Sequence, residues 1–139
     1  MVDFKDPRNC LEAALRRGTR VLSQRYNQQL AEVGLTGAQF SLLNALHQAG
    51  AVTIQQLAQY TATDRTTLTR NLKSLLAERW VKRQADPEDG RRFLLSLTPK
   101  GEQKRALSMA GWQQVQEQTL SRLGQDEARQ LMQWLDKLS

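Results

Sequence analysis

The chain has 139 residues, 40% hydrophobic and 24% charged, a composition that fits one globular domain and excludes disordered and membrane-embedded proteins. Lysine and arginine outnumber the acidic residues by 20 to 14, and the formal net charge of +6 favours a polyanionic partner. One cysteine cannot form an internal disulfide, and no stretch resembles a signal peptide or a membrane span. We therefore expect a cytoplasmic protein with no membrane partner.

The first predicted element is a long helix over residues 7–33. Gly34 follows it as the expected C-terminal cap. A helix of about 25 residues is longer than a small domain needs to cover its own core, so we expect it to pack on a second subunit. The residues of one face of this helix recur every three or four positions, at Leu11, Leu15, Gly18, Leu22, Tyr26, Leu30 and Val33.

Two capping boxes predict a pair of shorter helices. Thr36 and Gln39 open a helix that continues to about Ala49, where Gly50 ends it, and Thr53 and Gln56 open the next one. The polar segment 61–64 is predicted to be a turn. The residues expected to face the core are Phe40, Leu42, Leu43, Ala45 and Leu46 in the first helix, and Ile54, Leu57, Ala58 and Tyr60 in the second.

Residues 63–76 are predicted to form a helix with two different faces. One face is apolar, with Leu68, Leu72, Leu75 and Leu76 at helical spacing. The other carries short hydroxyls and long cations, at Arg65, Thr66, Thr69, Arg70 and Lys73. Such a face suits the DNA major groove, because arginine can bind guanine, and threonine offers a hydroxyl and a methyl. The alternative is a surface helix that is merely basic. Two short helices joined by a tight turn predict a helix-turn-helix.

A β-hairpin is predicted after this helix, from strand-like segments at 80–85 and 92–97. The turn between them, 86–91, is built from turn-forming residues, and Gly90 is free to take a positive φ. The hairpin makes the fold a winged helix, with Arg91 and Arg92 near the tip of the wing. Arg91 is suited to a narrow, electronegative minor groove. It could instead form a salt bridge with Asp86 or Asp89 that stiffens the loop, and both roles are compatible.

Two further helices are predicted at the C-terminal end. Thr98 and Pro99 begin the first, which reaches about Leu123, and a last helix covers 126–138. We expect a mainly α fold with a small β-hairpin wing, forming one domain over 1–139. Residues 7–33 and 99–139 are assigned to dimerisation and 35–98 to a winged helix-turn-helix. A symmetric dimer would present two recognition helices to a pseudo-palindromic DNA site.

Several short motifs resemble the MarR family of bacterial transcriptional regulators. They are Gly34-Leu-Thr, Gln39-Phe, Thr53-Ile-Gln-Gln-Leu-Ala58, Arg65-Thr-Thr-Leu-Thr-Arg70, Asp86-Pro-Glu-Asp-Gly-Arg91 and Leu97-Thr-Pro-Lys-Gly101. The resemblance covers essentially the whole chain and implies a homodimeric winged-helix factor. Such factors are often repressors, and many are released from DNA by an anionic or phenolic effector. It also implies that Thr66, Thr67, Thr69 and Arg70 face bases or phosphates and that Arg91 enters the minor groove.

The residue inventory argues against an enzyme. His47 is the one histidine, on a helix expected to be largely buried, and a general base needs positioned partners. No glycine-rich phosphate loop follows a predicted strand. One cysteine and one histidine cannot build a zinc site, so we expect no metal and no cofactor.

Other residues keep more than one interpretation. Cys10 could be a redox sensor whose pKa is lowered by nearby arginines, or a small buried residue at the dimer interface. Arg16 and Arg20 could pair with an anionic effector or lie on a solvated face, and Trp112 could contact the effector or pack the dimer. Trp80 is expected in the core and Trp134 in the dimer interface. A winged-helix adaptor that binds an acidic protein is the alternative function.

Overall fold

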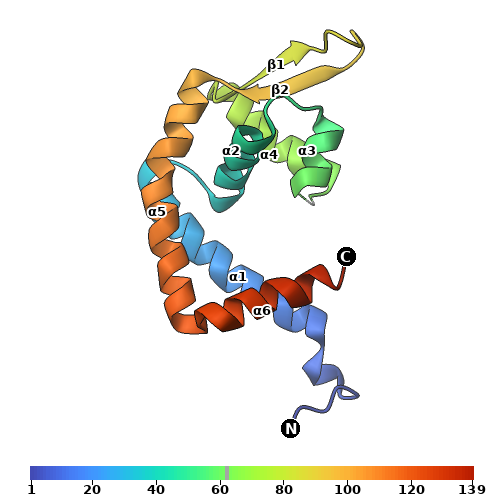
Figure 1. Ribbon diagram of the computed structural model, residues 1–139, viewed down its shortest axis with the longest axis vertical. Coiled ribbons are helices and arrows are strands. Elements are labelled where there is room, and N and C mark those ends of the chain that lie inside the picture. Colours follow the sequence, from blue (N-terminus) through green and yellow to red (C-terminus); the bar gives the residue numbers. More distant parts are fainter. Residues whose placement is uncertain (62) are drawn as a thin grey trace.

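The computed structural model describes residues 1–61 and 63–139, and in these the chain is mainly helical with one β-hairpin (Figure 1). This confirms the predicted fold class. Residue 62, in the predicted turn over 61–64, lies outside the described residues. The elements are a 3₁₀ turn Pro7–Asn9, α1 (Leu11–Leu30), a 3₁₀ turn Ala31–Val33, α2 (Gly37–Ala49), α3 (Ile54–Thr61), α4 (Arg65–Ala77), β1 (Val81–Ala85), β2 (Phe93–Leu97), α5 (Pro99–Leu123) and α6 (Gln125–Asp136).

The predicted caps determine where the helices begin. Thr36 and Gln39 form both hydrogen bonds of a capping box at α2, and Thr53 and Gln56 do the same before α3. The carboxylate of Asp64 accepts a hydrogen bond from the Thr67 amide at 2.9 Å and so begins α4. These side chains satisfy amides that the first helical turn leaves without partners.

One hydrophobic core fills the lobe formed by α2, α3, α4 and the hairpin. Its fully buried leucines come from each of the three helices, at Leu43, Leu46, Leu57, Leu68 and Leu75. Trp80, 7% exposed, closes the core beside the wing, as predicted. The antiparallel register of the wing runs from Val81 opposite Leu97 to Ala85 opposite Phe93.

A third segment joins the wing, which the sequence patterns did not predict. Val52, between α2 and α3, exchanges two backbone hydrogen bonds with Leu95 of β2, at 3.0 and 2.7 Å. The segment that leads into α3 is therefore hydrogen-bonded to the wing.

Three details differ from the sequence prediction. The first helix begins at Leu11 rather than residue 7, because Cys10 has extended backbone angles. Tyr60 points outward and is 59% exposed. Gly90 does not take a positive φ; instead Arg79 does, with φ 61°. Arg79 closes α4 in a Schellman-type cap, in which the Trp80 amide donates to the Leu75 carbonyl at 3.0 Å.

His47 lies on the exposed side of α2, a helix whose other face is largely buried. Its Nδ1 is 2.9 Å from a carboxylate oxygen of Glu102 on α5. Arg105 also pairs with Glu102, at 2.6 Å. The histidine thus belongs to a polar contact between α2 and α5.

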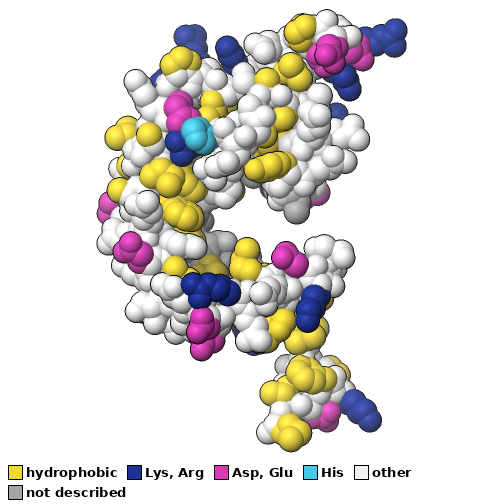
Figure 2. Space-filling model, viewed as in Figure 1, with side chains coloured by type: hydrophobic (Ala, Val, Ile, Leu, Met, Phe, Trp, Pro, Cys, Tyr) yellow, Lys and Arg dark blue, Asp and Glu magenta, His cyan; other side chains and the backbone are white. Residues whose placement is uncertain are grey.

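The long helices α1 and α5 pack against each other, α5 also packs against α2 of the lobe, and α6 turns back from the end of α5 (Figure 1). Many apolar side chains of these helices are exposed in the single chain, and Figure 2 shows apolar surface on the hollowed side of the molecule. They are Leu11, Leu15, Val21, Leu107, Leu123, Met132, Trp134, Leu135 and Leu138. No described helix is both long enough and apolar enough to cross a membrane.

Candidate nucleic-acid interface

The outer face of α4 carries the polar residues that the sequence indicated. Leu68, Leu72 and Leu75 are buried, and this fixes the rotation of the helix about its axis. Arg65, Thr66, Thr69, Arg70 and Lys73 are consequently exposed. The Thr69 hydroxyl donates to the Arg65 carbonyl at 2.8 Å, so its methyl group and its two acceptor lone pairs remain available for other contacts.

A groove of about 640 Å³ lies between α4, the start of α3 and the wing. Its lining contains six cations and no acidic residue: Arg65, Arg70, Lys73, Arg83, Arg91 and Arg92. Thr69 also lines it, whereas Thr66 and Thr67, on the first turn of α4, do not. Thr67 is partly buried, and its amide is bound by Asp64. The groove is therefore a strongly electropositive concavity between two elements that project from the lobe.

The two wing arginines make different contacts. Arg92 pairs with Asp86 at 3.2 Å and with Asp89 at 3.7 Å. Asp86 is 8% exposed and also accepts from the Glu88 amide at 2.9 Å. Arg91 uses only its backbone amide, which donates to Asp89 at 3.0 Å, and its side chain makes no ion pair within residues 1–61 and 63–139. The salt bridge considered for Arg91 is thus formed by Arg92.

Sequence reasoning missed two parts of the groove. Arg83 of β1 lies with its guanidinium carbon 4.8 Å from the centre of the Phe93 ring on β2. Thr53 and Gln55, at the start of α3, line the same groove. Alternation along β1 could have indicated which face Arg83 shares, but not which helix lies opposite that face.

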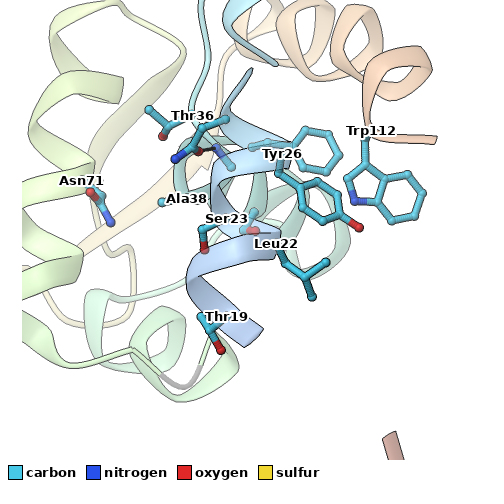
Figure 3. Close-up of a pocket in the computed structure, with 12 residues that line it drawn as sticks. Thr19, Leu22, Ser23, Tyr26, Thr36, Ala38, Asn71 and Trp112 are labelled. Carbon is cyan, nitrogen blue, oxygen red and sulfur yellow. Dashed lines mark hydrogen bonds between the residues drawn. The ribbon is translucent and has the colours of Figure 1, made fainter. Parts of the chain in front are cut away.

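A second cavity, of about 610 Å³, lies between α1, the start of α2, α4 and α5. Figure 3 shows Asn71 entering it from α4 and Trp112 from α5, with Ser23 and Tyr26 on α1. Trp112 stacks on Phe40, with ring centroids 6.0 Å apart. Trp112 thus lines this cavity, whereas Arg16 and Arg20 do not.

Cys10 is exposed in the single chain. Two of the nearby arginines have carboxylate partners, since Arg8 pairs with Asp6 and Arg16 with Glu12. Within the part of the chain that the structure describes, no three metal-ligating side chains gather into a cluster.

Comparison with known proteins places this geometry among DNA-binding regulators. The MarR family model matches residues 33–92, from the end of the first helical region to the wing. The multiple antibiotic resistance protein MarR of Salmonella typhimurium is 36% identical over 75 residues. That alignment covers 54% of this chain and 52% of the relative, so the chain spans about half the length of the curated MarR proteins that it matches.

Solved structures match over nearly the full length. A mutant of MarR from E. coli complexed with operator DNA has a TM-score of 0.87 and 25% identity, and the match covers 99% of both chains. BpsR of Bordetella bronchiseptica, whose DNA binding is regulated by 6-hydroxynicotinic acid, has a TM-score of 0.86 and 26% identity. That match covers 99% of this chain and 96% of BpsR.

Proposed function

We propose that the chain is a member of the MarR family and a transcriptional regulator that binds double-stranded DNA sequence-specifically as a homodimer. Proteins of this family are DNA-binding regulators and not enzymes. The proposal agrees with the absence of an acid–base or nucleophilic constellation in the sequence.

The observation that carries the proposal is the groove with six cations and no acid between α4 and the wing. In DNA binding, α4 would enter the major groove, where Arg70 and Thr69 reach base edges. Arg65 and Lys73 would neutralise phosphates and release counterions. Arg91, whose side chain has no acidic partner in the described chain, would extend into the neighbouring minor groove.

Homodimerisation is supported by the apolar side chains exposed on α1, α5 and α6. Trp134 is 53% exposed and Leu138 is 72% exposed, although large apolar side chains are normally covered. Residues 7–33 and 99–139 would form the dimer interface and 35–98 the DNA-binding lobe. A twofold axis would place two α4 helices about 34–36 Å apart, one turn of DNA, which requires a pseudo-palindromic operator.

We further propose that the regulator is a repressor whose DNA binding a small effector relieves. The cavity between α1 and the DNA-binding lobe is a suitable location, because a ligand there would contact both parts of the fold. BpsR responds to 6-hydroxynicotinic acid, so this aromatic acid is the first compound to test.

The test is fluorescence anisotropy with the duplex upstream of the protein's own gene, at about 150 mM salt so that non-specific attraction is not exaggerated. Scrambled duplex serves as competitor. A preference of about a thousandfold for the native duplex supports the proposal. Equal competition by scrambled DNA contradicts it and favours a basic adaptor that binds an acidic protein.

A further inference from the structure

We propose that the cavity between α1, α2, α4 and α5 binds a neutral aromatic amide or lactam in preference to an aromatic carboxylate, with Asn71 of α4 as its polar anchor. This rests on the proposed function, since it names the ligand class of the regulator. The cavity volume of about 610 Å³ suits a small aromatic molecule.

The side chains that line the cavity include no Asp, Glu, Lys, Arg or His, so the lining carries no charge at neutral pH. Its polar side chains are hydroxyls and amides, and its aromatic surfaces come from Tyr26, Phe40 and Trp112. Burial raises the pKa of Tyr26, whose hydroxyl donates to Gln116, so the phenol stays neutral at physiological pH. A carboxylate entering this site would lose water without gaining a cation in exchange.

The start of α2 also lines the cavity, and helix N-termini attract anions. Here most of that capacity is already used within the protein. The Gly37 amide donates to the Asn27 side chain at 2.7 Å, and the Gln39 amide donates to Thr36 at 3.1 Å. Of the first three helical amides, only that of Ala38 has no partner within the described residues, too few to hold a carboxylate.

Asn71 provides the matching groups for an amide. Its side chain lines the cavity from α4 and, within residues 1–61 and 63–139, forms no hydrogen bond to the protein. A primary amide offers one acceptor and two donors, and it can pair with a ligand amide or lactam through two parallel hydrogen bonds. The stacked rings of Phe40 and Trp112 offer apolar contacts for a flat ligand.

The same residue would link the ligand to DNA binding. Asn71 follows Arg70 directly, and its carbonyl accepts from Ser74, which also receives a hydrogen bond from Gln39 of α2 at 2.9 Å. A ligand held by Asn71 therefore acts on α4 itself and changes the relative stability of its positions.

The experiment compares 6-hydroxynicotinic acid with 6-hydroxynicotinamide, two molecules that differ chiefly in charge, by isothermal titration calorimetry on the full-length protein. We expect the amide to bind at least about tenfold more tightly than the acid. Asn71→Asp, which keeps the shape but removes the donors, should abolish most of the amide binding. Equal or tighter binding of the acid, or no binding of either probe up to about 1 mM, overturns the proposal.

A second variant adds the missing cation. Ser23→Lys places an ammonium group in the cavity lining and should shift the preference at least about tenfold toward the acid. Gln24→Lys, on the adjacent exposed residue of α1 outside the lining, is the matched control and should leave the preference unchanged. If Ser23→Lys and Gln24→Lys show the same preference between acid and amide, the ligand does not bind in this cavity and the proposal is overturned. Anisotropy without ligand tests DNA binding independently, so an acid preference in a protein that binds DNA refutes only this inference.

Discussion

Arg91 and Arg92 are adjacent in the chain, but of their two guanidinium groups it is that of Arg92 that pairs with carboxylates. The sequence predicted a salt bridge in this turn and an arginine for DNA, yet it could not assign each role to one residue. That assignment depends on the backbone path of the turn, in which the Asp89 side chain binds the Arg91 amide while Asp86 is buried beneath Arg92.

Arg91→Ala should weaken DNA binding without changing the melting temperature, and the loss should be greatest on operators with A·T-rich, narrow minor grooves. We expect about 1.5–3 kcal/mol, the usual range for a hydrogen bond to a charged group. Anisotropy on operators with A·T-rich and G·C-rich flanks measures it. Equal losses on both would exclude a minor-groove contact.

Arg92→Ala should instead lower the stability of the wing, because it leaves the Asp86 carboxylate with one hydrogen-bond donor fewer. Arg92 is more than half exposed, so we expect only about 1 kcal/mol. Thermal unfolding provides the measurement. An unchanged melting temperature would contradict the bracing role.

Arg70→Ala should reduce specific binding by about 1–3 kcal/mol if the guanidinium reads a base. Competition with random duplex is the decisive measurement. If specific and random DNA lose affinity equally, Arg70 is a phosphate contact.

At the scale of the helices, boundaries were predictable where a side chain caps its own helix. Thr36, Asp64 and Thr98 all do so, because capping is a local hydrogen bond that the sequence alone encodes. The position of Asn71 on α4 gave no such local signal. Asn71 was assigned no role, since only the packing of α1 and α5 beside the lobe creates the cavity that it enters.

The start of α5 depends on Gly101, and its replacement by alanine tests this contact. An added Cβ would lie 1.9 Å from the Trp80 carbonyl oxygen, a backbone atom that cannot move independently of the wing. Gly101→Ala should destabilise the fold by about 1–3 kcal/mol. Gly18→Ala is the control, because a Cβ there meets nothing within 4 Å, and it should be neutral or stabilising in thermal melts.

The contact between α2 and α5 predicts a dependence on acid pH. Arg105, and to a lesser extent His47, lower the pKa of Glu102 below its usual 4.5. Because the pKa is lower in the folded state, the stabilisation is present above the unfolded pKa and is lost as pH falls through the folded value. The destabilisation by Glu102→Gln should therefore shrink below about pH 4.5 in thermal melts. A destabilisation by Glu102→Gln that stays constant between about pH 3 and about pH 7 would contradict this prediction.

At the scale of the whole molecule, the apolar surface of α6 predicts how the dimer can be broken. Trp134→Glu should shift the protein toward monomer, because it places a charge where apolar contact is expected, and it should weaken operator binding about a hundredfold or more. Gln133→Glu, at the neighbouring exposed residue about 100° around the same helix, adds the same charge as a control. Sedimentation velocity measures the mass. A dimer that survives Trp134→Glu would exclude this face from the interface.

The two hydrogen bonds between Val52 and Leu95 have a consequence for the operator as well as for the protein. They join the wing to the segment before α3, so the wing and α4 cannot slide independently. The protein therefore carries a fixed spacing between its major-groove and minor-groove contacts. Substitutions in the bases between these contacts should be tolerated. Inserting one base pair there would instead separate the two contacts, and DNA binding would lose nearly all of the binding free energy that one of them contributes.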